Sequence, residues 1–143
     1  MKFKRLKDND LKAMAKRYVA ISELLKTNLN YEIKETRDDL EAFQNIIDLK
    51  IVDPANGAHF YDGMGIVLGR MLITYRKGFD WWIIEDEVGQ DIVLRYKETD
   101  FYINVIGHIA RELEEGRYLN IHQSFAGLVK DIDQFFIPVM NKA

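Results

Sequence analysis

Hydrophobic residues in the first half of the chain recur at helical spacing. Between residues 8 and 28 they fall at steps of three and four, which predicts a helix with one apolar face. The same spacing predicts helices over 36–50 and 59–77. The residues expected on the buried face of the first helix are Leu11, Met14, Ala15, Tyr18, Ile21, Ser22 and Leu25.

Three glycines lie inside the third predicted helix, at Gly63, Gly65 and Gly69. Each costs up to about 1 kcal/mol relative to alanine in a helix interior. That cost predicts close packing of this helix against a sheet or another helix. The run also loosely resembles a dinucleotide-binding fingerprint, but its spacing is wrong and no strand precedes it, so we expect no cofactor.

The periodicity changes at residue 81. The segment WWIIEDEVGQDIVLRYKETDFYINV (81–105) is rich in aromatic and β-branched residues, which predicts three antiparallel strands at about 80–86, 91–97 and 101–106. The first strand is apolar on both faces. Such a strand is covered on both sides, or is covered on one side and used for binding on the other.

The length of the first turn decides which residues of this meander face each other. A two-residue turn at Val88 and Gly89 places Trp82 opposite Arg95, where a cation–π contact worth about 0.5–2 kcal/mol can form. A turn one residue longer places Trp82 opposite Tyr96. The sequence does not choose between these registers, and it favours a structural role for Arg95 over ligand recognition.

Two more helices are predicted after the meander, over 107–116 and 121–137. The order ααα-βββ-αα predicts the α+β class, with a three-stranded antiparallel β-meander packed by about five helices. The 143 residues fit a single domain, 1–143. It would comprise a basic N-terminal helix (8–28), a core (36–116) and a C-terminal helix (121–137).

Composition excludes several functions. The chain has no cysteine, so disulfides, thiolate nucleophiles and cysteine-based metal sites are excluded. No signal peptide or membrane span is predicted, and we expect a cytoplasmic protein. The net charge of −3 is uneven, because residues 1–17 hold seven basic and two acidic side chains. We interpret that block as a solvated helix face; the alternative is contact with an acidic partner. The acidic remainder argues against nucleic-acid binding.

Candidate chemistry is concentrated at the predicted hairpin, where Glu85, Asp86, Glu87 and Asp91 lie close together. Neighbouring carboxylates can bind Ca²⁺ or Mg²⁺, but this spacing does not match an EF-hand loop. A solvated hairpin end or a contact with a protein partner is therefore favoured over a metal site. The three histidines and two serines form no recognisable triad, and we expect no catalytic residue, metal or cofactor. The histidines are His59, His108 and His122, and the serines are Ser22 and Ser124.

Residues 36–116 resemble an uncharacterised bacterial family, domain of unknown function thirty-eight-oh-six. The resemblance lies in GMGIVLGRML (63–72) followed by WWIIEDEVGQDIVLRYKETD (81–100). The family pattern is an aliphatic-glycine helix, a Trp-led strand, an Asp-Glu-aromatic-Gly turn and a strand ending in Leu-Arg-aromatic. Val88 stands where the family commonly has an aromatic residue. The resemblance implies no known activity and carries over no catalytic residue.

These patterns favour a non-enzymatic protein-binding module, with an immunity or antitoxin-like protein that neutralises a partner toxin or secreted effector as the best specific hypothesis. One alternative is an enzyme or small-ligand binder with an acidic and arginine site beside the sheet. Another is a homo-oligomeric structural protein that uses the aromatic sheet face, and a homodimer fits either class. The residues expected to bind the partner are Glu85, Asp86, Glu87, Asp91, Arg95 and Trp81.

Overall fold

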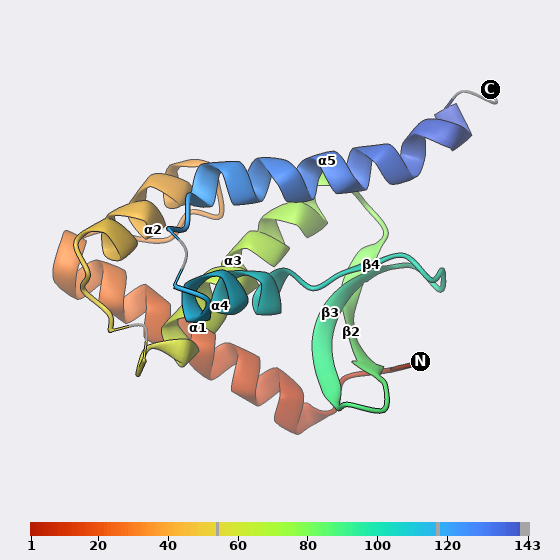
Figure 1. Cartoon of the computed structure of the whole chain (residues 1–143), viewed down its shortest axis with the longest axis horizontal. Coiled ribbons are helices and arrows are strands. Elements are labelled where there is room, and N and C mark those ends of the chain that lie inside the picture. The colour runs from red at the N-terminus through yellow and green to blue at the C-terminus, as the bar shows by residue number, and fades with distance from the viewer. Residues whose placement is uncertain (54, 117, 141–143) are drawn as a thin grey trace.

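The computed structural model describes residues 1–53, 55–116 and 118–140 and has an α+β fold. Its helices lie on one side of an antiparallel sheet (Figure 1). This confirms the predicted class and the order ααα-βββ-αα. The elements are β1 (Lys2–Lys4), α1 (Asp8–Leu29), α2 (Asp38–Asp48), α3 (Ala58–Tyr75), β2 (Phe79–Glu85), β3 (Gln90–Tyr96), β4 (Tyr102–Ile103), α4 (Val105–Glu114) and α5 (Ile121–Met140).

The sheet has one strand more than the sequence predicts. Strand β1 pairs with β2, so that Phe3 lies opposite Ile84, and the strand order is β1-β2-β3-β4. A three-residue segment with two lysines has little strand propensity of its own. Its conformation is therefore set by pairing with β2, which sequence periodicity does not reveal.

Neither predicted register of the meander is correct. Glu85 pairs with Gln90, which leaves a four-residue loop at 86–89, and Trp82 consequently pairs with Val93. The Trp82–Arg95 contact nevertheless forms, because Arg95 lies two residues further along β3 on the same face as Val93. The predicted cation–π pair is thus a diagonal one, with the guanidinium carbon of Arg95 4.5 Å from the Trp82 ring centroid.

Helix α3 occupies the middle of the helical layer (Figure 1), and its glycines allow three other elements to approach it closely. A Cβ atom at Gly63 would lie 2.5 Å from the carbonyl oxygen of Arg17 in α1. One at Gly65 would lie 2.6 Å from the Cα of Ile106 in α4, and one at Gly69 would lie 2.3 Å from the Trp81 ring in β2. The predicted reason for these glycines, close packing, is confirmed.

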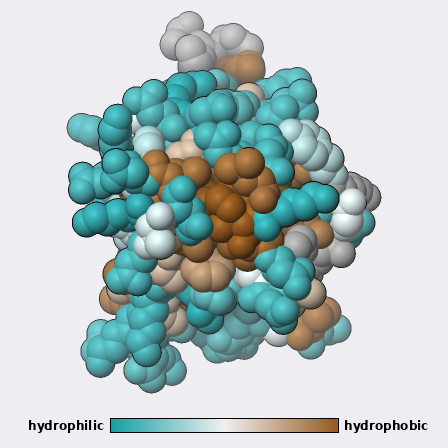
Figure 2. Space-filling view, turned by 90° about the vertical axis from the view of Figure 1, so that its left-hand side faces the viewer, coloured by the Kyte–Doolittle hydropathy of each residue, from teal (hydrophilic) through white to brown (hydrophobic). Residues whose placement is uncertain are grey.

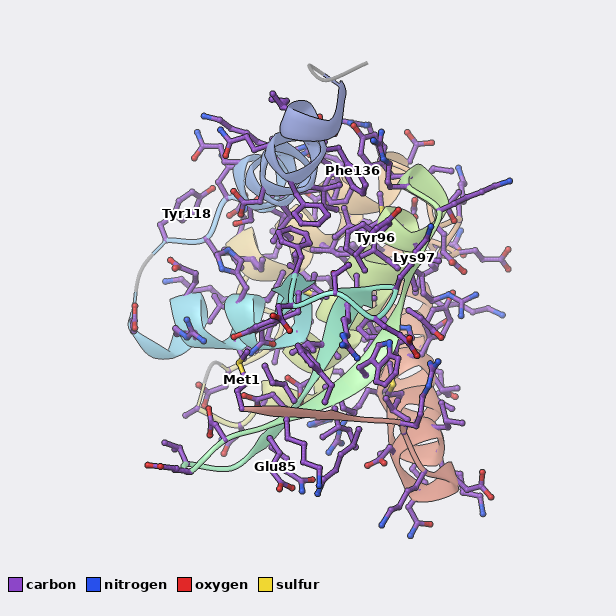
Figure 3. The ribbon with its side chains drawn as sticks, turned by 90° about the vertical axis from the view of Figure 1, so that its right-hand side faces the viewer. Met1, Glu85, Tyr96, Lys97, Tyr118 and Phe136 are labelled. Atoms are coloured by element: carbon purple, nitrogen blue, oxygen red, sulfur yellow. The ribbon has the colours of Figure 1, made fainter. Side chains whose placement is uncertain are left out.

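Helix α5 spans the top of the molecule in Figure 1 and joins α2 to the end of the sheet. Its aromatic side chains meet those of β3 and the loop after it. The rings of Phe135 and Phe101 are stacked with centroids 4.2 Å apart, and Phe136 contacts Tyr96 edge-on at 4.9 Å. Tyr96 and Phe136 are labelled in Figure 3, where they lie between the sheet and α5.

The outer face of the sheet has no helix of the described chain over it, and Figure 3 shows β1 crossing in front. Side chains close this face instead. The Arg5 guanidinium lies 3.7 Å from the centroid of Trp82, and that of Arg95 lies 3.9 Å from Phe3. Arg95 also donates a hydrogen bond of 2.6 Å from Nε to the carbonyl oxygen of Thr99. Of the two arrangements expected for β2, coverage on both sides is the one observed, with helices on one face and the N-terminal segment on the other.

The close approach of α4 to α3 can be tested with a pair of alanine substitutions. G65A places a methyl group against the α4 backbone, so it should destabilise the fold by about 1–3 kcal/mol through overpacking. G127A, in α5, meets no atom within 4 Å and should stabilise by about 0.5–1 kcal/mol through helix propensity. Urea denaturation of both variants measures the difference. Equal effects of the two would contradict the packing argument.

Candidate protein-binding surface

The loop between β2 and β3 is held in shape by one of its acidic residues. The Asp86 carboxylate accepts hydrogen bonds from the backbone N–H groups of Val88 and Gly89, at 2.8 and 3.1 Å. The Asp86 N–H in turn donates to the carbonyl oxygen of Gly89 at 3.0 Å. Asp86 therefore acts first as a turn residue, in the manner of an Asx turn.

Glu85 is also engaged within the chain. Its carboxylate accepts hydrogen bonds from Lys4 at 2.5 Å and from the side-chain amide of Gln90. These two contacts, that of Lys4 first, hold the pKa of Glu85 below its usual range. Glu85 therefore fastens the edge strand β1 to the hairpin, and Figure 3 shows it at the lower edge of the sheet.

This pairing predicts a pH-dependent effect of E85Q. A carboxylate with a lower pKa in the folded protein stabilises the fold above its unfolded pKa, and that contribution is lost as pH falls through the folded pKa. We expect E85Q to lower the thermal midpoint at about pH 7, and the deficit to shrink as pH falls below about 4.5. The exposed Glu87, which lies outside the paired strand residues, provides the control, and E87Q should leave the thermal midpoint at about pH 7 unchanged. A deficit that is constant down to about pH 2 would count against the ion pair.

Three residues of the hairpin end face solvent. Glu87 and Asp91 are exposed, and Val88 between them is 95% exposed, the highest value among the exposed large hydrophobic residues. The hairpin therefore ends in an apolar side chain flanked by negative charge. Of the six residues predicted to bind a partner, Asp86, Glu87 and Asp91 are exposed, and Asp86 is engaged by hydrogen bonds within the loop.

Arg95 and Trp81 lie on opposite faces of the sheet. Arg95 is 9% exposed on the outer face, whereas Trp81 points to the helical side and packs on Gly69 of α3. Because neighbouring strand residues alternate between faces, the pairing of Trp82 with Val93 enforces this separation. The six predicted residues consequently do not converge on one pocket, and Arg95 has the structural role that the sequence favours.

Sequence reasoning missed an apolar groove that lies along α1. Leu11 and Val19 are 52% and 51% exposed, and Ala15 between them is exposed as well. The expectation that Leu11 and Ala15 belong to the buried face was wrong, because α1 buries only the narrower stripe of Met14, Ile21 and Leu25. A four-residue spacing of Leu11, Ala15 and Val19 is the signal that could have revealed a second apolar stripe. The groove, about 400 Å³ in volume, is lined by Leu11, Met14, Ala15, Tyr18, Val19, Ile66, Arg70 and Trp81.

One end of this groove is fixed by an arginine. Arg70 Nε donates to a Glu35 carboxylate oxygen at 2.7 Å, and the Tyr18 hydroxyl donates to the other oxygen at 3.1 Å. Burial, followed by the Glu35 carboxylate, raises the pKa of Tyr18. Glu35 has a left-handed φ of 58°, and the buried carboxylate of Asp39 orients this turn by accepting the Glu35 N–H at 2.7 Å. The contact with Glu35 therefore holds Arg70 at the wall of the groove.

The long rim of the groove is basic. Lys12 and Lys16 lie three residues before Ala15 and Val19, so they are their neighbours on the helix surface. The adjoining depression on α1 is lined by Lys12, Lys16 and Arg17 and shares Ala15 with the apolar groove. The apolar groove is thus bordered by positive charge along α1.

The hairpin end and the first part of α1 belong to the same part of the molecule. A further depression of about 290 Å³ has Met14 and Arg17 of α1 on one side and Gln90 and Asp91 of β3 on the other. Figures 1 and 3 both place the start of α1 and the β2–β3 loop at the lower end of the molecule. Opposite charges therefore border one another on this end.

A second region of concave surface lies between α4, β4 and α5. His108 and Asp131 line two adjoining depressions of about 570 and 380 Å³, and Ser124 lines the smaller one. Among the described residues no hydrogen bond joins these three side chains, so they lack the geometry of a Ser-His-Asp triad. The described chain also has no cluster of three or more metal-ligating His, Asp or Glu side chains.

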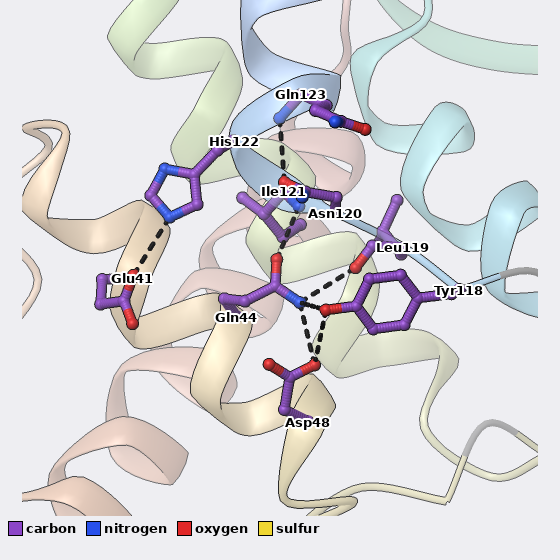
Figure 4. Close-up of polar contacts among 9 residues, drawn as sticks. All are labelled: Glu41, Gln44, Asp48, Tyr118, Leu119, Asn120, Ile121, His122 and Gln123. Carbon is purple, nitrogen blue, oxygen red and sulfur yellow. Dashed lines mark hydrogen bonds and ion pairs between the residues drawn. The ribbon is translucent and has the colours of Figure 1, made fainter.

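The start of α5 is held by a buried glutamine (Figure 4). Gln44 of α2 accepts the backbone N–H of Ile121 at 2.8 Å and donates to the carbonyl oxygen of Leu119 at 3.0 Å. Its amide also donates to Asp48 at 3.0 Å and to the Tyr118 hydroxyl at 3.3 Å. This network satisfies backbone groups at a helix terminus and is structural.

Replacement of Gln44 should therefore affect stability. Q44A leaves the buried Ile121 N–H without its partner, which costs about 1–3 kcal/mol. The matched control is Q123A, at an exposed position of the same helix terminus, with an expected change within about 0.5 kcal/mol. Urea denaturation measures both. A change for Q44A as small as that for Q123A would show that the network does not hold α5.

A solved structure and a known family are similar to this chain. The class is an α+β domain, and a crystal structure from Bacteroides thetaiotaomicron shares the fold with a TM-score of 0.78 at 18% sequence identity. The match covers 90% of this chain and 47% of that one, so the chain spans about half the length of its structural neighbour. The chain belongs to the family described as "Domain of unknown function (DUF3806)", which matches residues 39–125. This confirms the resemblance seen in the sequence.

Two further findings complete the comparison. No curated protein matches the chain. Within the described ranges no helix combines the length and the apolar character that a membrane span requires.

Proposed function

We propose that this chain is a cytoplasmic, non-enzymatic protein-binding module. Two exposed features carry the proposal. The hairpin end presents Val88 between acidic neighbours, and α1 presents an apolar groove with a basic rim. The specific role that we propose is that of an immunity or antitoxin-like protein, which would occlude a toxin or a secreted effector.

The energetics of this surface support protein binding. Burial of an exposed Val or Leu side chain contributes about 1.5–3 kcal/mol, so Val88, Leu11 and Val19 can act as anchors. Charges around such anchors set partner choice and speed association. A small-ligand site usually has polar groups that converge in a concave pocket, whereas the single arginine of this groove is already paired with Glu35.

The test is capture of a stoichiometric protein partner from the organism that encodes the chain, followed by binding measurements with the purified partner. We expect V88E and L11E each to weaken binding at least tenfold, because each places a charge where an apolar contact forms. The control is L49E. Leu49 is 64% exposed at the C-terminal cap of α2 and lines neither the hairpin nor the α1 groove. Figure 2 shows an apolar patch within a polar surface on the side of the molecule that lies at the left of Figure 1.

Two results would contradict the proposal. One is the absence of any stoichiometric partner; the other is a partner that binds V88E and L11E as tightly as it binds the wild type. For the immunity role, co-expression with the captured partner should restore growth of cells that the partner alone inhibits. If the captured protein does not inhibit growth, the chain would be a protein-binding module but not an immunity protein.

A further inference from the structure

The hairpin end and the α1 groove are complementary to each other in both polarity and charge. The hairpin presents Val88, 95% exposed, between the carboxylates of Glu87 and Asp91. The groove presents an apolar floor beside the ammonium groups of Lys12 and Lys16. An occupant of the groove needs an apolar side chain with acidic neighbours, and the chain itself carries such a segment.

The size and shape of the two parts also agree. The loop 86–89 is compact, because Asp86 closes it with three hydrogen bonds. A cavity of about 400 Å³ that is open to solvent can accept the tip of such a loop, with Val88 toward Leu11 and Val19. Because the loop is already ordered, docking costs little conformational entropy.

The positions of the hairpin and of the α1 groove are compatible with a symmetric dimer. The hairpin and the start of α1 lie at one end of the molecule (Figure 1), and Arg17 and Asp91 border the same depression between these two elements. A two-fold axis through that depression would bring the acidic hairpin of each copy to the basic helix of the other, which gives two identical contacts and a closed dimer. Direct α1-to-α1 pairing is less favourable, because it would bring Lys12 and Lys16 of both copies together.

We propose that two copies of this chain associate about a two-fold axis, with the 86–89 loop of each copy in the α1 groove of the other. The inference rests on the proposed function, since it assigns a partner to the same protein-binding surface. It replaces the aromatic sheet face as the expected site of self-association. That face is already closed by Phe3, Arg5 and Arg95.

The first experiment measures the mass of the purified full chain by sedimentation velocity, over about 1–200 µM at about 50 and 500 mM salt. We expect a dimer at the higher concentrations and its dissociation at the higher salt, where the Debye length is only a few ångströms. V88E should be monomeric throughout, because it places a charge in the apolar groove. The control L49E should behave as the wild type does.

The second experiment is a charge exchange. E87K and K12E should each weaken dimerisation by roughly two- to tenfold, since every dimer has two copies of each exposed ion pair. The double variant E87K/K12E reverses both charges and should restore the dimer. Circular dichroism confirms that each variant is folded, so that loss of the dimer reports on the contact itself.

Several outcomes would overturn the inference. These are a wild type that is monomeric at all concentrations, a dimer that V88E leaves intact, a dimer that L49E disrupts, and a double variant as weak as its parents. A monomer that still binds a foreign partner through Val88 and Leu11 would refute self-association and leave the proposed function standing. A dimer without any foreign partner would support self-association and refute the immunity role.

Discussion

The close approach of three elements to α3 is the constraint on which the rest of the structure depends. At Gly63, Gly65 and Gly69 the backbone of α3 lies against α1, α4 and β2 with no room for a methyl group. Glycine within a helix is costly, so the sequence accepts a loss of helix propensity to bring these elements into contact. The position of Trp81 beside Gly69 sets how β2 meets the helices, and through β2 it sets the orientation of the whole sheet.

That orientation decides what the sheet exposes. With its inner face on α3, the sheet turns Trp82, Val93 and Arg95 outward. Cation–π contacts join the N-terminal segment to this face, from Arg5 to Trp82 and from Arg95 to Phe3. The outer face is thus closed without a helix. The exposed apolar groups at this end of the molecule include the tip of the hairpin and a stripe along α1, and the neighbours of these two carry opposite charges.

The candidate surface also shows that charged residues clustered in a sequence do not all belong to a binding site. Glu85 and Asp86 belong to the acidic hairpin, but one anchors β1 and the other shapes the turn. Arg95 is buried under Phe3 and joined to Thr99. Glu87 and Asp91 are exposed beside them, and Val88, which the sequence did not single out as a contact, stands between these two.

The sequence by itself determined the α+β class, the helices, the three meander strands and the tight packing of α3, because each follows from local periodicity or from the cost of glycine in a helix. Tertiary structure alone decided the rest. Strand β1 exists only through its pairing with β2, and the register follows from hydrogen bonds of Asp86 that a count of turn residues does not contain. The α1 groove is formed by α1 together with α3 and β2, so the periodicity of α1 alone did not reveal it. Which stripe of a helix is buried depends on what packs against it.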